Sequence, residues 1–305
     1  MNIEVKNLTK TYGPQKAVDN ISFAVKTGEI LGFLGPNGAG KTTTMKIITN
    51  YINKDSGDVQ IQGNSVSTGQ FKKNIGYLPE HNPLYEDMPV MDYLQYCAEL
   101  QGVSKSMVMQ RIGEMIKLCG LNAEKHKKIG ELSKGFRQRV GLAQAMIHDP
   151  EILILDEPTT GLDPNQIVEI RELIKRIGRS KTVILSTHIL PEVEATCDRI
   201  LIINKGQIVA DGTADTLRKQ ASSNVITRLQ ITGADLAIVR DELSKIPGAK
   251  TVQILDLDTN RIEVESDHNI AEILFRTAVK HHWIISEMIP VETKLEDIFR
   301  DLTLN

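Results

Sequence analysis

Short apolar runs alternate with amphipathic stretches over the first two thirds of the chain. Six runs rich in isoleucine, leucine and valine have the length of strands and cover residues 3–8, 21–25, 58–62, 152–155, 183–186 and 200–204. Apolar residues at consecutive positions, as in 152–155, suit strands that are covered on both faces of a sheet. The pattern therefore predicts a sheet whose central strands are largely parallel.

Two stretches between these runs carry apolar residues at helical spacing and have clear end signals. One follows Ser104, ends at Gly120 and has on one face Val108, Ile112, Met115, Ile116 and Cys119. The other opens at Asp163-Pro164, ends at Gly178 and turns inward Ile167, Ile170, Leu173, Ile174 and Ile177. Strands that alternate with helices predict an α/β domain over residues 1–219, with a helical insert at about 90–132.

A polar stretch at residues 220–224 is typical of a linker. Beyond it, the pattern of residues 225–305 reads strand, helix, strand, strand, helix, strand and a final helix. This β-α-β-β-α-β order predicts a small α+β domain with a ferredoxin-like arrangement. We find no candidate chemistry in this second domain.

The composition narrows the class of protein. The chain has 305 residues, 41% hydrophobic and 25% charged, which is ordinary globular composition with room for two domains. A net charge of −3 lacks the basic surplus typical of nucleic-acid-binding proteins, so no nucleic-acid partner is expected. Three widely spaced cysteines indicate a reducing compartment. The absence of an export signal and of an apolar run of about 18 residues predicts a cytoplasmic chain.

The strongest local signal begins where the apolar stretch at 30–34 ends. It reads Gly35, Pro36, Asn37, Gly38, Ala39, Gly40, Lys41, Thr42 and Thr43, which matches G-x-x-x-x-G-K-[ST]. Glycines let backbone N–H groups turn toward phosphates, and the following helix presents its positive end to the same charge. Lys41 is suited to reach the β- and γ-phosphates of ATP, and the Thr42 hydroxyl is suited to ligate Mg²⁺. The loop alone leaves kinases, GTPases and many ATPases open.

A second signal ends the apolar run at 152–155, where Asp156 and Glu157 follow directly. Asp156 is placed to hold Mg²⁺ through its water shell. Glu157 is placed to accept a proton from a water that attacks the γ-phosphate. Acidic residues after a strand are common in turns, but their combination with the phosphate loop favours a catalytic pair.

Five motifs in order resemble the nucleotide-binding domain of ATP-binding cassette (ABC) proteins over about residues 1–216. They are the phosphate loop, Leu132-Ser133-Lys134-Gly135-Phe136-Arg137-Gln138-Arg139, Asp156-Glu157, Gly161-Leu162-Asp163 and Ser186-Thr187-His188. The resemblance implies a P-loop ATPase core with a mixed, largely parallel sheet. It also implies that Ser133, Lys134 and Gly135 contact the γ-phosphate of an ATP held by a second subunit.

The resemblance implies further roles, each with a simpler structural alternative. His188 would touch the γ-phosphate and the attacking water, although a histidine after a strand is often structural. Asp163 would lie across the seam of a dimer, and it also suits a helix cap before Pro164. Tyr12 would stack on adenine, although a single tyrosine is more often a packing residue.

The sequence departs from the family pattern at two places. Glu80 stands where the family has a glutamine, so a carboxylate replaces an amide near Mg²⁺ and the phosphates. We expect a changed metal or coupling role at this position. In the signature, Lys134 and Phe136 replace a glycine and a glutamine. Lys134 either attracts the γ-phosphate or is simply solvated.

Within the family, three segments resemble subunits of export-type systems: Tyr77-Leu78-Pro79-Glu80, Leu132-Ser133-Lys134-Gly135 and the closing Leu295-Glu296-Asp297-Ile298-Phe299. The longer run from Tyr77 to Tyr85 resembles more narrowly the gliding-motility-associated group. The resemblance implies an ATPase subunit that dimerises and drives a separate polytopic permease, on the cytoplasmic face of the inner membrane. The permease would dock near Glu80 and residues 91–100. The alternatives are a soluble ABC ATPase acting on ribosomes or DNA, and a phosphotransferase, for which we find no acceptor site.

Overall fold

The computed structural model describes residues 2–69, 71–221, 225–256, 258–291 and 295–304. The chain divides into two compact units, Met1–Ala214 with Leu302–Asn305, and Asp215–Asp301. The sequence places this boundary at 219, so the structure moves it a few residues toward the N-terminus and assigns the end of the chain to the first unit. The side-chain amide of Asn204 donates there to the carbonyl of Leu302 at 3.1 Å.

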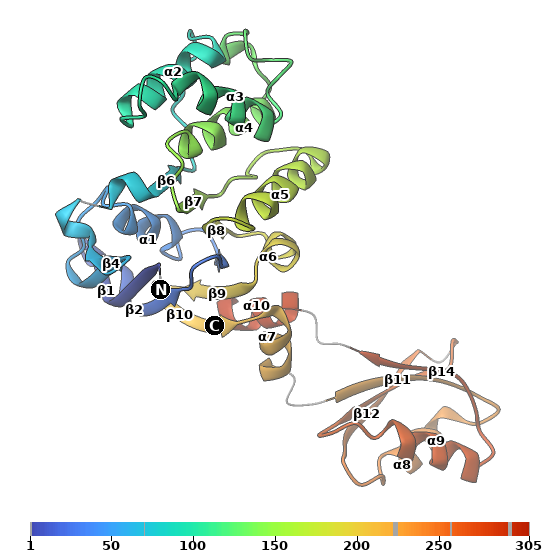
Figure 1. Ribbon diagram of the computed structural model, residues 1–305. Helices are drawn as coiled ribbons and strands as arrows, with labels where there is room; N and C mark the ends of the chain where they lie inside the picture. The colour runs from blue at the N-terminus through green and yellow to red at the C-terminus, as the bar shows by residue number, and fades with distance from the viewer. Residues whose placement is uncertain (1, 70, 222–224, 257, 292–294, 305) are drawn as a thin grey trace. The chain divides into compact units, whose positions relative to one another are not determined.

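A six-stranded sheet forms the centre of the first unit (Figure 1). Its order is β10-β9-β3-β8-β7-β6; β9 through β6 run parallel, and β10 pairs antiparallel with β9. The strands are β3 Ile30–Leu34, β6 Ile75–Leu78, β7 Ile152–Asp156, β8 Thr182–Thr187, β9 Arg199–Asn204 and β10 Gln207–Gly212. This is the mixed, largely parallel sheet that the sequence predicts.

Both faces of this sheet are covered, which explains the continuous apolar runs. In β7, Ile152 and Ile154 pack into one hydrophobic cluster, whereas Leu153 and Leu155 pack into a second cluster on the opposite face. A strand buried on both sides needs apolar residues at every position. The two clusters therefore follow directly from the sequence pattern.

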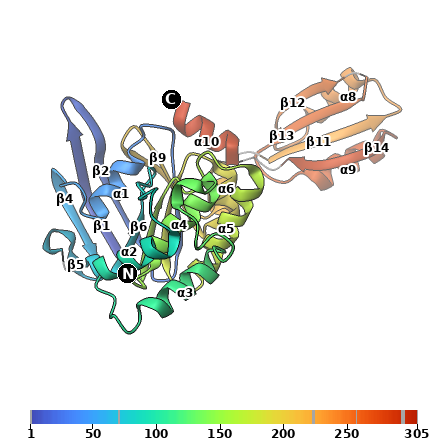
Figure 2. The ribbon, with the colours of Figure 1, turned by 90° about the horizontal axis from the view of Figure 1, so that it is seen from above.

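An outer antiparallel sheet and α1 cover one face. The outer sheet has the order β2-β1-β4-β5, with β1 Ile3–Tyr12, β2 Gln15–Val25, β4 Ser56–Ile61 and β5 Asn64–Ser65. Helix α1, Lys41–Ile48, contributes Met45, Ile47 and Ile48 to the cluster between the sheets. Figure 2 shows the outer sheet on one side of the central sheet and α4 to α6 on the other.

Other helices lie on the side of the opposite face. They are α2 Val90–Leu100, α3 Val108–Leu118, α4 Lys134–Met146, α5 Pro164–Gly178 and α6 Leu190–Thr196. Short 3-10 helices lie at Val66–Thr68, Lys72–Asn74 and Ile129–Glu131, and Val66 packs into the cluster that α1 joins. α2 and α3 fall within the range 90–132. None of the described helices is both long enough and apolar enough to cross a bilayer.

Gly178 does not end α5 in the way that the sequence predicts. It is the last helical residue, and Arg179 follows as the C-cap with a right-handed backbone. A Cβ at Gly178 would lie 2.3 Å from Cδ1 of Ile30 on β3. Gly178 is therefore explained by close packing of the helix on the sheet. Gly120, by contrast, has φ +68° just after α3, as expected of a helix stop.

The second unit has the predicted element order. After α7, Ala214–Ala221, the chain forms β11 Val225–Thr232, α8 Leu236–Leu243, β12 Ala249–Asp256, β13 Arg261–Ser266, α9 Ala271–Lys280, β14 Ile284–Val291 and α10 Leu295–Leu304. The last residues of α10 belong to the first unit. The sheet order is β12-β13-β11-β14, and all its pairs are antiparallel. The strand that follows α8 is separated from β11 by β13, which is the split β-α-β arrangement of a ferredoxin-like domain.

Candidate functional site

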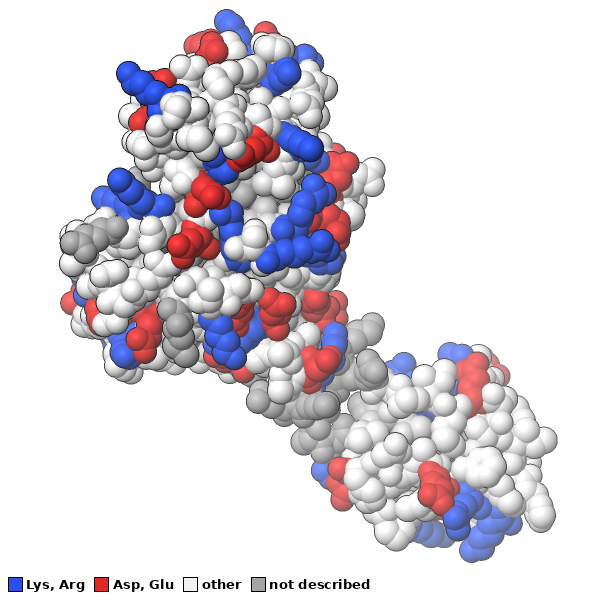
Figure 3. Space-filling view, in the orientation of Figure 1, with Lys and Arg blue, Asp and Glu red and all other residues white. Residues whose placement is uncertain are grey.

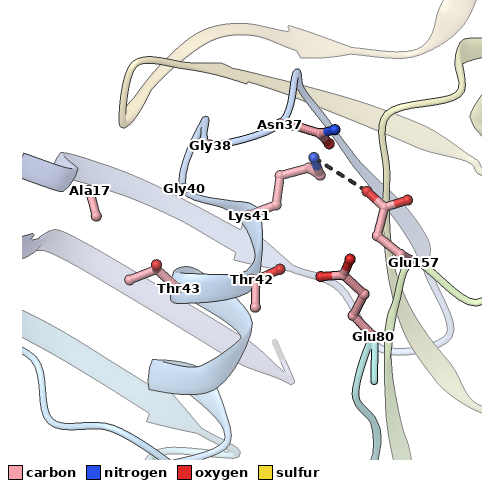
Figure 4. Close-up of a pocket in the computed structure, with 9 residues that line it drawn as sticks. All are labelled: Ala17, Asn37, Gly38, Gly40, Lys41, Thr42, Thr43, Glu80 and Glu157. Atoms are coloured by element: carbon pink, nitrogen blue, oxygen red, sulfur yellow. Dashed lines mark ion pairs between the residues drawn. The ribbon is translucent and has the colours of Figure 1, made fainter. Parts of the chain in front are cut away.

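The phosphate loop connects β3 to α1 and borders a cavity of about 280 Å³. Figure 4 shows the residues that line it, Ala17, Asn37, Gly38, Gly40, Lys41, Thr42, Thr43, Glu80 and Glu157. Six of these come from the loop and the first turn of α1, and Glu157 follows β7. The fold therefore brings the predicted phosphate loop and the predicted base to one cavity.

Two glycines of the loop are required by neighbouring backbone. A Cβ at Gly40, which has φ +109°, would lie 2.3 Å from the carbonyl oxygen of Ala17. A Cβ at Gly35 would lie 2.4 Å from the carbonyl oxygen of Ile203. Only glycine lets the chain pass this close to both strands and still turn into the helix.

Lys41 is buried at the bottom of the loop. Its ammonium donates to the carbonyls of Gly35 at 2.8 Å and Pro36 at 3.2 Å, and lies 3.3 Å from Oε1 of Glu157. Figure 4 shows this ion pair crossing the cavity. Because the two loop carbonyls fix the ammonium, its charge is directed at the place where phosphate oxygens would bind.

Asp156 is fully buried, and only one of its carboxylate oxygens is hydrogen-bonded. Oδ1 accepts from the hydroxyls of Thr42, at 3.2 Å, and Ser186. Oδ2 is buried and has no partner among the described residues. Burial raises the pKa of this carboxyl, and the nearby carboxylates of Glu80 and Glu157 raise it further.

This arrangement fits a magnesium ion. Mg²⁺ prefers oxygen ligands, and a buried carboxylate oxygen without a donor beside the Thr42 hydroxyl is such a ligand. The carboxylate of Glu80 points toward Thr42 in Figure 4. Two carboxylates, Glu80 and Glu157, and one lysine line this cavity, and the buried Asp156 accepts from Thr42 beside it. A divalent cation would compensate this excess of negative charge.

Glu157 is held in a strained backbone conformation. Its φ is +50°, in the left-handed region that costs a residue with a side chain on the order of 1–3 kcal/mol. Its amide donates to the carbonyl of Ser186 at 3.0 Å, and its Oε2 accepts from the Thr160 hydroxyl at 3.2 Å. Nδ1 of His188 lies 2.9 Å from the same oxygen. Since an ionised carboxylate only accepts, the imidazole is the donor.

Two hydroxyl side chains, of Ser186 and Thr160, join the predicted Asp156, Glu157 and His188 at the site. The hydroxyl of Ser186 holds Asp156, and the hydroxyl of Thr160 holds Glu157. Ser186 opens the Ser186-Thr187-His188 motif, and Thr160 stands three residues after Glu157. The pairing of β7 with β8 places Ser186 opposite Asp156, whereas the bond of Thr160 to Glu157 is local.

The signature residues stand at the start of α4, where Ser133 is the N-cap, as predicted. Its hydroxyl accepts from the amide of Phe136 at 3.4 Å. Lys134 does not line the phosphate cavity; it lines a second cavity of about 420 Å³, which also includes Glu80 and Glu157. A Cβ at Gly135 would lie 2.6 Å from the side chain of Gln166, so glycine lets α4 approach α5.

Asp163 and Tyr12 occupy exposed positions. Asp163 is the N-cap of α5, and its Oδ1 accepts from the amide of Gln166 at 2.9 Å. Tyr12 is the last residue of β1, 51% of its surface is exposed, and the ammonium of Lys10 lies 5.6 Å from its ring centre. Tyr12 is not among the residues that line the phosphate cavity. Its contact with adenine stays a prediction, as does the place of Asp163 at a dimer seam.

Comparison with known proteins decides the family. Residues 18–160, which include the phosphate loop, the signature and Asp156-Glu157, match the family described as ABC transporter. The linearmycin resistance ATP-binding protein LnrL of Bacillus subtilis is 32% identical over 306 residues, 99% of this chain and 98% of that protein. The chain belongs to the ABC transporter ATP-binding proteins.

Solved structures of ABC cassettes have the same fold. The ATP-binding subunit of an ABC transporter is 31% identical, with a TM-score of 0.66 over 80% of this chain and 100% of that one. A dimeric ATP-binding cassette in a post-hydrolysis state with ADP and phosphate is 25% identical, with a TM-score of 0.63 over 69% and 98%. This ABC cassette is thus an ATP-binding ATPase subunit of a transporter, and the export-type resemblance agrees with the resistance protein among its relatives.

Proposed function

We propose that this cassette pairs with a second copy, holds MgATP at the seam and drives a separate membrane permease by hydrolysing it. The observation that carries the proposal is the cavity in which Lys41 pairs with Glu157, which His188 contacts in turn, next to the buried Asp156 with one unpartnered oxygen. This set supplies a phosphate anchor, a proton acceptor and a metal ligand in one place.

The contacts of Lys41 and Glu157 support a mechanism for ATP hydrolysis. Phosphate oxygens of ATP would replace Glu157 at the Lys41 ammonium, which leaves Oε1 of Glu157 ready to accept a proton. An attacking water gives that proton to Glu157 as its oxygen bonds to the γ-phosphorus, and the bond to the β-phosphate oxygen breaks to release ADP. His188 and Thr160 hold the other carboxylate oxygen and so orient the base.

Thr42, Asp156 and Glu80 would hold Mg²⁺. The ion would neutralise charge on the β- and γ-phosphates as it develops during transfer. Glu80 provides a full negative charge where an amide is usual in the family, so we expect tighter metal binding at this position. Its exposed place directly after β6 also lets it respond to a partner on the surface.

A second copy would complete the site through Ser133, Lys134 and Gly135. These residues begin α4, and a helix N-terminus with free N–H groups attracts phosphate. The dimeric cassette with ADP and phosphate supports this pairing, because it has the same fold. On the face shown in Figure 3, lysine and arginine side chains stand beside acidic ones over the first unit, which favours a protein partner over a nucleic acid.

The permease would bind beside Glu80, on the cytoplasmic face of the inner membrane. Tyr85 is 56% exposed and packs edge-on against Tyr93 and Tyr96 of α2, with ring centres 6.0 and 5.8 Å apart. Exposed, rigid aromatic residues are the usual anchors of protein interfaces. This cluster lies within the range, Glu80 and residues 91–100, that the sequence suggests for docking.

The test is to recover the tagged chain from gently solubilised native membranes and identify its partners by mass spectrometry. A polytopic membrane protein in near-equal amount is expected, and Tyr85→Ala is expected to reduce its recovery severalfold. Tyr51→Ala is the matched control, because Tyr51 is 74% exposed and lies directly after α1. Recovery only with ribosomal or DNA-bound partners would support the alternative of a soluble regulatory ATPase.

A further inference from the structure

A carboxylate outside the phosphate cavity joins two loops of the site. Glu192 lies in the first turn of α6 and is 2% exposed. Its Oε1 accepts from the Thr159 hydroxyl at 2.6 Å, and its Oε2 accepts from the Thr187 hydroxyl at 2.8 Å. No lysine or arginine of the described residues forms an ion pair with it, so the two hydroxyls are its hydrogen-bond donors there.

Thr187 forms hydrogen bonds both to the segment that carries His188 and to the phosphate loop. Its hydroxyl accepts from the amide of Ile189 at 3.1 Å and thereby brackets His188. Its carbonyl accepts from the amide of Gly35 at 3.3 Å, which ties the same residue to the phosphate loop. A shift at Thr187 would therefore move the imidazole and the loop together.

Thr159 fixes the segment that follows the catalytic carboxylate. It lies two residues after Glu157, and the next residue, Thr160, bonds the carboxylate of Glu157. The carbonyl of Thr159 accepts from the amide of Leu162 at 3.1 Å, directly before Asp163. The Glu192 bond therefore joins the loop that leads to the expected dimer seam with the loop that carries His188.

Packing alone does not explain Glu192. Burying a carboxylate costs free energy, and an apolar side chain of similar size would usually fill such a space at lower cost. A carboxylate has two oxygens in fixed positions, and each accepts a charge-assisted hydrogen bond, which is stronger than a neutral one. The two carboxylate oxygens of Glu192 can therefore hold the Thr159 loop and the Thr187 loop in one relative arrangement.

We propose that Glu192 is a positioning residue for ATP hydrolysis, which holds the Thr159 and Thr187 loops so that His188 and Glu157 stay aligned. The proposal rests on the proposed roles of Glu157 and His188. Glu192 is not among the residues that line the phosphate cavity, so it acts through the two threonines.

The test removes each hydroxyl without changing side-chain shape. Thr159→Val and Thr187→Val are each expected to lower kcat about 10-fold or more, because small misplacements of catalytic groups are costly. In Thr159→Val, KM for MgATP should stay within about twofold, since Lys41 and Thr42 are untouched. Glu192→Gln still accepts one hydroxyl bond and should retain more activity than Glu192→Ala.

Thr196→Val is the matched control. Thr196 is a buried threonine of the same helix, and its hydroxyl has no partner among the described residues. This variant should keep the kcat of the unmodified chain, and thermal melting should show all variants folded. Wild-type kcat in folded Thr159→Val and Thr187→Val would overturn the positioning role. Unchanged hydrolysis in Glu157→Gln would instead overturn the proposed catalytic mechanism.

Discussion

At the scale of single residues, the site is built at the expense of stability. Asp156 keeps a buried oxygen without a partner, and Glu157 adopts a left-handed backbone. Each feature costs free energy in the folded chain, and each is held in place by hydroxyls of neighbouring loops. Such local costs are typical of functional sites, because a polar group without a hydrogen-bond partner in the protein is free to bind the ligand.

Replacing Asp156 with asparagine should stabilise the nucleotide-free chain. The folded-state pKa of Asp156 is raised, so the stability linked to its proton is present at low pH and is lost as the pH rises through that value. At neutral pH the ionised carboxylate is therefore unfavourable, and Asp156→Asn should raise the free energy of unfolding by about 1 kcal/mol.

Chemical denaturation without nucleotide measures this gain, and a loss of stability would contradict it. The same variant should hydrolyse ATP at least about 100-fold more slowly, because it loses a charged magnesium ligand. Ser186→Ala is the control, because it removes a hydrogen bond to Asp156 but leaves the charge.

At the scale of elements, local sequence patterns predict the strands and helices, while small residues set how closely these elements pack. Gly178 of α5 and Gly135 of α4 stand where a Cβ would meet a side chain of the neighbouring element. Gly113 of α3, in contrast, has no atom within 4 Å of an added Cβ. Close packing therefore explains the glycine at some helical positions of this chain but not at Gly113.

Gly113→Ala and Gly178→Ala should change stability in opposite directions. Alanine at Gly113 should stabilise the chain by roughly 0.5–1 kcal/mol, because alanine favours the helix and nothing obstructs it. Alanine at Gly178 should destabilise by about 1–3 kcal/mol, because it collides with Ile30.

Thermal and urea unfolding of both variants check this pair. Ile30→Val, which removes the colliding Cδ1, should recover part of the loss in the double variant with Gly178→Ala. Equal stabilisation by both alanines would show that α5 shifts freely on the sheet.

At the scale of the whole molecule, the cassette fold forms the phosphate cavity, and the proposed pairing of two copies would add the signature residues to it. The phosphate cavity is formed within one chain, whereas Ser133 and Gly135 do not line it. The alignment with LnrL spans 99% of the chain and so includes the ferredoxin-like unit. The proposed two-copy arrangement would give the signature residues a ligand.

Glu157→Gln should trap a dimer with ATP. The amide keeps the size of the side chain but does not accept a proton, so hydrolysis should fall about 100-fold or more while binding persists. Size-exclusion chromatography with light scattering should show dimers in saturating MgATP and monomers without it. Adding Gly135→Trp should abolish the dimer by blocking the signature, and a Glu157→Gln chain that stays monomeric would contradict the pairing.

Local patterns were enough to predict much of the site. The phosphate loop, Asp156 and Glu157 are adjacent to strands whose apolar runs are unmistakable, so their common location followed from a parallel sheet. The role of the Ser186 hydroxyl was not predicted, because its partner Asp156 lies on a neighbouring strand. The role of the Thr160 hydroxyl depends on the conformation of the loop after Glu157. Glu192 was missed because a glutamate in a helix is normally solvated.

Local spacing in the sequence was enough to predict many of the elements, the ferredoxin-like order of the second unit and the chemical types at the phosphate loop. The folded arrangement was needed to show which oxygen of Asp156 has no partner, why Gly178 is a glycine and that Glu192 joins Thr159 to Thr187. These features arise between segments far apart in sequence, where packing and hydrogen-bond geometry, and no local pattern, select the partner.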